Sequence, residues 1–280
     1  MRTFLKILGV GAITIIFRVL FQLPMQDTGQ TVLAPSIFAT NGTLPVAFSV
    51  YGLILYSMLT ALFLLVSPRI MGTGVVKGLK FALSLCAIWS IYLFEPLPHA
   101  KSILLDSVAY VLADGVALLV MGALSGLLLG QGKDEAIAEE KRKLPLTKVV
   151  PSVVAVAAVF VCGRLLQYVA CHIYSSFDTR PLETIMWDVA TGLVAAVVML
   201  WWSGRIRKMG RIQSTLVLGC LMFGVNLLLF NFLMPLVLAV DIGDLIVRTG
   251  VDTLAVTIGC FCAIPKVTQS EVESTKRRYD

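Results

Sequence analysis

Residues 104–130, LLDSVAYVLADGVALLVMGALSGLLLG, form an apolar segment of helix length that carries two carboxylates, Asp106 and Asp114, in its first half. The same spacing recurs near the C-terminus. Adding 138 to each residue number turns Asp106 into Asp244 and Asp114 into Asp252, and the second pair also lies in an apolar segment. We therefore interpret the chain as a duplication with two related halves.

The composition indicates which solvent surrounds most of the chain. Of the 280 residues, 58% are hydrophobic and 14% are charged, and the mean hydropathy is +0.88. A soluble core could not bury that much apolar surface, so we expect lipid to cover it. Apolar segments of about 20 residues, enough to cross ~30 Å of hydrocarbon as a helix, recur without the alternation typical of barrel strands. These features predict an all-α integral membrane protein.

Apolar segments of this length number eight. We predict transmembrane helices at residues 3–23, 46–66, 76–94, 102–130, 149–170, 184–202, 212–230 and 236–264. The first could be mistaken for a signal peptide, because Arg2 and Lys6 lie at its start. It lacks a small-residue cleavage site, so we expect it to remain as a helix.

Basic residues lie almost entirely on one side of an eight-helix order, because the other side has only Lys101 and Arg180. By the positive-inside rule, both termini then face the cytoplasm of a cell membrane, either a plasma membrane or a bacterial inner membrane. This topology also accounts for the net charge of +6. We therefore expect the lipid bilayer, and not nucleic acid, to be the partner of the basic segments.

Residues 133–148 form the one cytoplasmic connection with enough mixed charge to be a linker. This linker divides the chain into a first four-helix repeat at residues 1–132 and a second at residues 149–266, followed by a cytoplasmic tail at residues 267–280. Because four is an even number, each repeat enters and leaves the membrane on the same side. The repeats are therefore predicted to be parallel and related by an axis along the membrane normal.

Charged side chains inside the predicted helices are the strongest functional signal. A charge in hydrocarbon costs ~2.5–3.5 kcal/mol on insertion scales, so those that are kept usually face protein or a water-filled cavity. Helical spacing puts Asp244, Arg248 and Asp252 on one face, so we expect Arg248 to neutralise one of the two carboxylates. The first repeat has Tyr110 at the position of Arg248. The predicted site residues are Arg18, Asp106, Asp114, Arg164, Asp244, Arg248 and Asp252.

These charges form a belt in the outer half of the membrane when residues are counted from the helix ends. We expect Arg18 to pair with a carboxylate of the first repeat and Arg164 with one of the second. A fully paired belt could be purely structural and hold helices in register. The alternative is that one carboxylate titrates during a transport cycle, and Asp114 is the first candidate because its repeat lacks the additional arginine.

Two functions of different classes fit this pattern. In the first, the protein is a permease or proton-coupled transporter, and the pathway for a small solute or for protons runs through the charged site between the repeats. In the second, it is a structural or accessory membrane subunit whose charges tie helices together. Its longest predicted non-helical segment, residues 24–45, would then bind a protein or lipid partner.

A glycine motif indicates where two helices pack closely. Gly122, Gly126 and Gly130 recur at intervals of four residues and present a surface without side chains. Such a surface lets the backbone of a neighbouring helix approach. We interpret this motif as a packing feature, separate from the charged face of the same helix.

Enzyme and cofactor motifs are absent from the sequence. It contains no Walker A, Gly-x-Ser-x-Gly, His-Glu-x-x-His or dinucleotide motif, which favours a protein that is not an enzyme. A lipid-modifying enzyme built from Asp and Arg residues stays open, because such a site needs no local motif. No cofactor is predicted, since no histidine lies within a predicted helix to bind haem. A metal site would need Cys171 and His172 to meet His99 and Glu95 from another loop.

Overall fold

The computed structural model describes residues 1–23, 33–98, 103–130, 146–203 and 210–263, and the side chains of these except at residues 103–106 and 146–148. Eight of the helices in these ranges are long and apolar enough to cross a membrane, as the hydropathy of the sequence predicted. Seven of them are α1 (Arg2–Gln22), α3 (Leu44–Val66), α4 (Gly74–Leu93), α5 (Ile103–Leu129), α6 (Leu146–Val169), α7 (Pro181–Ser203) and α11 (Ile242–Ala263).

The remaining candidate span runs from Arg211 to Val237. It begins with three consecutive elements, α8 (Arg211–Thr215), η2 (Leu216–Val225), which is a π-helix, and α9 (Asn226–Asn231), and it ends with the short helix α10 (Met234–Val237). The wider turns of η2 were not predicted. Two glycines bring η2 close to α11, since a Cβ atom at Gly219 would lie 2.3 Å from the Thr257 hydroxyl oxygen and one at Gly224 would lie 2.5 Å from the methyl group of Thr253.

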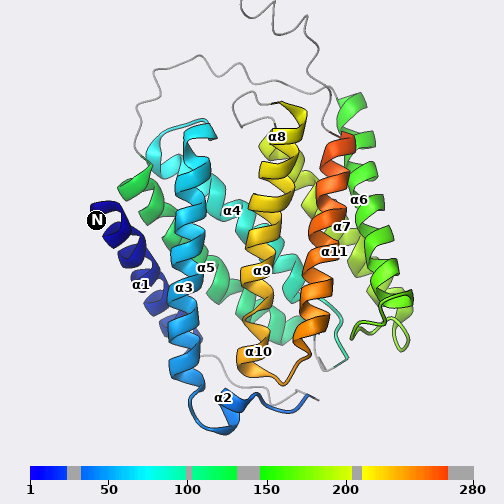
Figure 1. Ribbon diagram of the computed structural model, residues 1–280, viewed down its shortest axis with the longest axis horizontal. Coiled ribbons are helices and arrows are strands. Elements are labelled where there is room, and N and C mark those ends of the chain that lie inside the picture. The colour runs from blue at the N-terminus through cyan, green and yellow to red at the C-terminus, as the bar shows by residue number, and fades with distance from the viewer. Residues whose placement is uncertain (24–32, 99–102, 131–145, 204–209, 264–280) are drawn as a thin grey trace, which may run out of the picture.

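The long helices pack side by side and alternate in direction (Figure 1). We call the end of the bundle at which α8 begins the α8 end and the opposite end the α2 end, after the short helix α2 (Ile37–Thr40). We also call α1, α3, α4 and α5 the N-terminal group, and α6, α7, the α8–α9 helix and α11 the C-terminal group. Within the N-terminal group, α1 packs on α3 and α5, and α4 packs on α5. Within the C-terminal group, α6 packs on α7 and α11, and η2 packs on α11.

Helices α4 and α5 pack closely through the glycine motif that the sequence predicted. A Cβ atom at Gly78 of α4 would lie 1.9 Å from the carbonyl oxygen of Gly122, and one at Gly126 would lie 2.4 Å from that of Gly74. Both distances are far below van der Waals contact. Only glycine therefore fits this crossing, and the prediction of close packing is confirmed.

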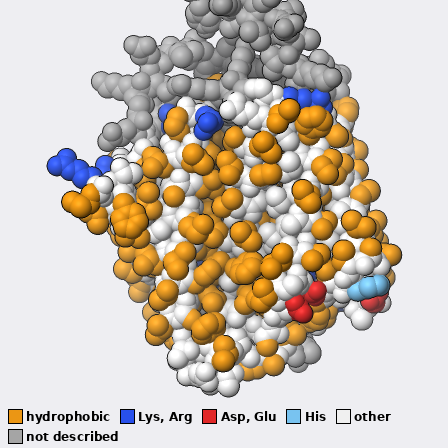
Figure 2. Space-filling view, viewed as in Figure 1, with side chains coloured by type: hydrophobic (Ala, Val, Ile, Leu, Met, Phe, Trp, Pro, Cys, Tyr) orange, Lys and Arg blue, Asp and Glu red, His pale blue; other side chains and the backbone are white. Residues whose placement is uncertain are grey.

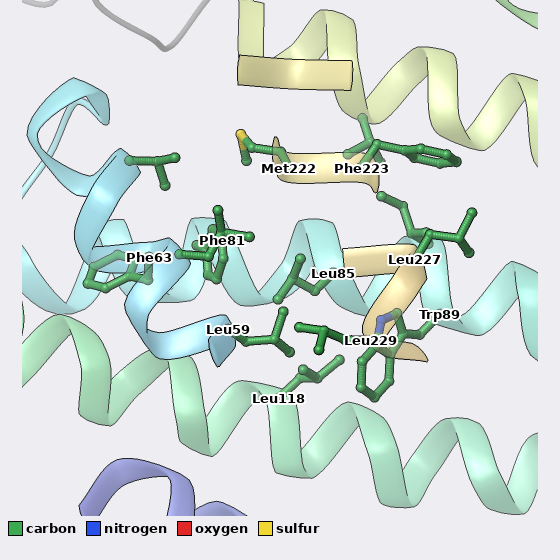
Figure 3. Close-up of a cluster of buried hydrophobic side chains, with 14 of the residues drawn as sticks. Leu59, Phe63, Phe81, Leu85, Trp89, Leu118, Met222, Phe223, Leu227 and Leu229 are labelled. Carbon is green, nitrogen blue, oxygen red and sulfur yellow. The ribbon is translucent and has the colours of Figure 1, made fainter. Parts of the chain in front are cut away.

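The main hydrophobic core lies between the two groups (Figure 3). Leu59 and Phe63 of α3 and Phe81 of α4 are buried on one side of it, and Phe223 of η2 and Leu227 of α9 are buried on the other. Because both groups contribute to this core, its burial also holds them together.

The outer surface is apolar over its middle. Figure 2 shows hydrophobic side chains across this face, Lys and Arg near the α8 end, and Asp, Glu and His near the α2 end. Leu20, Leu127 and Leu166 are more than half exposed on the helix surfaces. A surface of this kind suits hydrocarbon, which supports the assignment of a multi-pass membrane protein.

The α2 end differs from the prediction in two places. Residues 24–45 were expected to be non-helical throughout, but α2 begins after Ser36, whose hydroxyl oxygen accepts the amide of Ala39. The last helix was expected from residue 236 and begins at Ile242, because residues next to Leu238 pair with the segment before α2. The amide of Ala239 donates to the carbonyl oxygen of Ala34 at 2.9 Å, which holds this connection extended.

Candidate functional site

Arg164 of α6 lies at the centre of a cluster of buried charges near the α2 end. Its side chain has no exposed surface. The Nη2 atom lies 2.7 Å from Oδ2 of Asp252 on α11, and the Nη1 atom lies 3.1 Å from Oε1 of Glu95, which follows α4. One guanidinium therefore joins a carboxylate of its own group to a carboxylate of the other group.

Glu95 bridges two arginines. Its second oxygen, Oε2, lies 2.7 Å from Nη1 of Arg248 on α11. Arg248 also donates from Nη2 to the carbonyl oxygen of Tyr174, in the connection between α6 and α7. Two cations and two anions thus meet in one cluster, which we call the Glu95 cluster: Glu95, Arg164, Arg248 and Asp252.

Asp252 has donors on both of its oxygens. The Tyr92 hydroxyl donates to Oδ2 at 2.8 Å, and Nε2 of Gln167 donates to Oδ1 at 2.7 Å. A buried carboxylate is expensive unless it is both paired and hydrogen-bonded. Asp252 meets both conditions, because Tyr92, Gln167 and Arg164 come from α4 and α6 to surround it.

Aromatic rings enclose the Arg164 guanidinium. Its Cζ atom lies 4.7 Å from the centre of a Trp187 ring and 5.6 Å from the rings of Tyr92 and Phe160. Trp187 in turn donates from its indole nitrogen to the carbonyl oxygen of Ile91 at 2.7 Å. Ring faces attract a cation and also exclude water, so they fix the guanidinium in place.

A second buried ion pair lies within the N-terminal group. Nε of Arg18 on α1 contacts Oδ1 of Asp114 on α5. Arg18 also donates to the side-chain oxygen of Gln22 at 2.8 Å, and its Cζ atom lies 5.6 Å from the Phe48 ring and 6.0 Å from the Tyr110 ring. No described residue of the C-terminal group forms an ion pair with Arg18 or Asp114.

The predicted pairings are partly correct. Arg18 does pair with a carboxylate of the N-terminal group and Arg164 with one of the C-terminal group, so those two expected pairs are confirmed. The expectation for Arg248 is wrong. Its guanidinium bonds Glu95 instead of Asp244 or Asp252, because Asp252 is already bound to Arg164.

The other two predicted site residues lie outside the Glu95 cluster. Asp244 accepts the amide of Tyr174 at 2.9 Å and so holds the α6–α7 connection on α11. The backbone of Asp106 belongs to α5, but its side chain lies outside the part of the chain that the structure describes. A role of the seven predicted residues in a transport pathway stays a prediction.

Two carboxylates of this region, Glu95 and Asp188, were missing from the predicted site residues. Asp188 of α7 is fully buried, and its Oδ1 accepts the hydroxyl of Tyr168 at 2.9 Å. It lies inside the predicted helix at residues 184–202, so the criterion that selected the other charges would have found it. Gln167 carries no comparable signal, because a glutamine near a helix end is common at an interface.

The described residues do not support the metal site that the sequence left open. Cys171 and His172 belong to no group of three potential metal ligands there. The predicted fourth member, His99, lies outside the described residues.

The arrangement is a set of buried ion pairs and hydrogen bonds between helices. No protein-family model matches the chain, and comparisons with curated proteins and with solved structures found no match. The function must therefore be argued from the residues of this chain.

Proposed function

We propose that the protein is a permease in which two parallel four-helix repeats rock against each other and the Glu95 cluster closes the pathway at the α2 end. The repeats would be residues 1–132 and 149–266, joined by the linker at 133–148 and followed by the tail at 267–280. The pathway would carry a small solute or protons between the repeats.

The packing within the two groups supports the duplication. In each group the first helix packs on the second and the fourth, and the third packs on the fourth. The contacts between the groups follow the same rule, since α4 packs on α7 and its counterpart η2 packs on α3. A two-fold axis along the membrane normal would generate this set of neighbours.

The two buried ion pairs also correspond. Arg18–Asp114 joins the first and fourth helices of the N-terminal group, and Arg164–Asp252 joins the first and fourth helices of the C-terminal group. The same chemistry at the same place in both groups supports a common origin. We assign Arg18–Asp114 to the internal stability of the first repeat, because it does not reach the other group.

The observation that carries the proposal is the position of Glu95. It follows α4 in the N-terminal group, yet both of its ion-pair partners, Arg164 and Arg248, belong to the C-terminal group. If the groups rock apart at the α2 end, these are the pairs that must break. A carboxylate that bridges two arginines across such an interface is well placed to act as a gate.

Further hydrogen bonds join the two groups at the same interface. The carbonyl oxygen of Ile91 accepts from Trp187, the hydroxyl of Tyr92 donates to Asp252, and the carbonyl oxygen of Leu97 accepts from Arg180 at 2.8 Å. All of these contacts, like those of Glu95, come from residues 91–97 and reach the C-terminal group. Nearer the α8 end, the bond from the Trp202 indole to the Ser84 hydroxyl oxygen also joins the groups, without a charge.

The orientation that we propose places the α8 end in the cytoplasm. Lys6 and Lys80 donate there to the carbonyl oxygens of Leu128 and Met71, each at 2.9 Å, and Arg211 donates to that of Phe261. Cations at this level suit the inner leaflet of a cell membrane. A single cysteine placed at Lys141 should then react with an impermeant thiol reagent only from the cytoplasmic side. Reaction from the outside would overturn this orientation.

A cross-link between the two groups at the α2 end tests the proposal that they must separate for transport. Leu97→Cys and Arg180→Cys would be combined in a cysteine-free background, reconstituted in proteoliposomes and joined by a short cleavable cross-linker. Flux would be read as uptake of radiolabelled amino acids, sugars, nucleosides and small anions, supplied in turn, and a trapped pH dye would report the movement of protons. We expect cross-linking to stop any solute-dependent flux and cleavage of the linker to restore it.

A matched control lies within the C-terminal group. Tyr174→Cys and Asp244→Cys join the α6–α7 connection to α11, which already contact each other. This cross-link should leave the flux unchanged, because both positions move together. Equal flux with and without the 97–180 cross-link would remove the gate. If no supplied solute gives a flux, the alternative function is favoured, which is a structural or accessory membrane subunit that binds a protein or lipid partner.

A further inference from the structure

Asp188 is the one described carboxylate of the buried region near the α2 end that takes part in no ion pair. It lies seven residues after the start of α7 at Pro181 and is fully buried. At a rise of ~1.5 Å per residue, that depth is roughly 10 Å along the helix. Its Oδ1 has one donor, the Tyr168 hydroxyl, while its Oδ2 is buried without a hydrogen-bond partner.

The charges around Asp188 already balance without it. Arg164 on α6 and Arg248 on α11 carry two positive charges, and Glu95 and Asp252 carry two negative charges. Both arginines bind these partners through their Nη atoms, while the Nε atom of each is buried without a hydrogen-bond partner. An ionised Asp188 would add a third negative charge with no cation of its own.

A neutral carboxyl group fits this place better than a carboxylate. A buried carboxylate needs donors on both oxygens, and Oδ2 of Asp188 has none in the structure. The Thr191 hydroxyl, also buried and without a partner, lies on the same face of α7 at a spacing of three residues. The two groups are not hydrogen-bonded to each other in the structure, so neither Oδ2 of Asp188 nor the Thr191 hydroxyl has a partner there.

We propose that Asp188 is a proton-binding site, neutral in this closed arrangement, which releases its proton to water when the α2 end opens. The O–H bond of the carboxyl group breaks, the carboxylate stays on α7, and the proton passes to bulk water, while closure reverses both changes. The site itself is argued from burial and hydrogen bonding, and only its use in transport rests on the proposed permease.

A proton suits the site better than a metal ion. Hard cations such as Ca²⁺ and Mg²⁺ take about six oxygen ligands. Among the residues that the structure describes, no group of three His, Cys, Asp or Glu side chains could hold a metal. A proton needs only the one carboxylate oxygen that has no donor.

The surroundings of Tyr168 indicate the route to water. Tyr168 lies in the last turn of α6, and its ring stacks on Phe177 of the α6–α7 connection at a centroid distance of 5.1 Å. The same connection is held on α11 through Tyr174, which contacts Arg248 and Asp244. These contacts lie within the C-terminal group, so they keep this side of Tyr168 covered when the two groups separate. Opening of the Glu95 cluster would instead move residues 91–97 away from α7, where Trp187, next to Asp188, donates to Ile91, and water would reach Asp188 from that side.

Infrared difference spectroscopy on the full chain in lipid nanodiscs tests this proposal directly. A neutral carboxyl group has a carbonyl band separate from the bands of amides and carboxylates. We expect the wild-type protein to show such a band at neutral pH, to lose it at alkaline pH, and to lack it in Asp188→Asn. Asp241→Asn is the matched control, because Asp241 is exposed at the start of α11 and asparagine keeps its capping role. The band should persist in that variant.

Tyr168→Phe provides a second readout if Asp188→Asn does not fold. The carboxyl group then loses its one hydrogen-bond donor but keeps its proton, so the band should remain and shift to higher frequency. Absence of the band in the wild-type protein, its persistence in Asp188→Asn, or an unshifted band in Tyr168→Phe would each overturn the proton site. None of these results depends on flux, so they are distinct from a failure of the permease proposal.

Discussion

The pairs Arg18–Asp114 and Arg164–Asp252 are chemically the same, but they differ in what surrounds them. Among the residues that the structure describes, the first has one additional polar partner, Gln22, and stays within the N-terminal group. The second is bonded to residues of both groups and shares its arginine with Glu95. One pair ties two helices together, and the other belongs to a contact between two halves of the molecule.

This difference indicates that the connectivity of a buried ion pair, more than the number of buried charges, decides whether it joins only two helices or also joins the two groups. A lone buried pair can be replaced by apolar side chains with little loss, whereas removal of one member of a network leaves uncompensated charges. The two pairs should therefore respond differently to the same substitutions. Unfolding in mixed micelles with increasing denaturing detergent can measure this.

Removal of the arginine should have the largest effect. Arg164→Met leaves the carboxylates of both Asp252 and Glu95 without this cation, while Arg18→Met leaves only Asp114. We expect the free energy of unfolding to fall by ~5 kcal/mol for Arg164→Met and by ~3 kcal/mol for Arg18→Met, within the range for broken buried pairs. Equal losses would contradict the distinction between the pairs.

Replacement of both the arginine and the aspartate of each pair tests the same difference. Arg18→Met combined with Asp114→Leu should recover most of the stability, with a net change of ~1 kcal/mol or less, because no other charge is stranded. Arg164→Met combined with Asp252→Leu should stay ~3 kcal/mol or more below the wild-type protein, because Glu95 has lost one of its cations and Gln167 and Tyr92 have lost their acceptor. Recovery in both double variants would show that the Glu95 cluster is not an energetic unit.

The sequence predicted the pairs within each group better than the contacts between the groups. Eight helices and the two pairs within the halves were predictable, because lipid makes the hydropathy of each segment decisive and a buried charge needs a partner. The role of Glu95 was not, because it depends on which helices of the two groups meet at the α2 end. The π-helical turns of η2 were also unpredicted, since they depend on how Gly219 and Gly224 pack against α11.

A third comparison concerns helix packing in the two groups. Gly78→Leu should destabilise the protein by ~1–3 kcal/mol or more, because its side chain would overlap the backbone of Gly122. Gly250→Leu on α11 is the control, since no atom lies within 4 Å of a Cβ there. It should change the unfolding midpoint little. A tolerated leucine at position 78 would mean that α4 and α5 can separate without loss.

The smallest expected effects come from the two glutamines beside the arginine pairs. Gln22 accepts from Arg18, and within the described ranges it makes no bond to Asp114. It is partly exposed at the end of α1, so Gln22→Leu should cost ~0.5 kcal/mol. Gln167 is fully buried and donates to Asp252, but its own Oε1 has no partner. Gln167→Leu therefore loses a hydrogen bond to a charged group and also removes a buried unpaired oxygen, so these two changes partly cancel to a cost of ~1 kcal/mol. The same detergent titration would resolve the two variants. A larger loss of unfolding free energy for Gln22→Leu than for Gln167→Leu would contradict this expectation. It would show that Arg18–Asp114 depends on Gln22 more than the Glu95 cluster depends on Gln167.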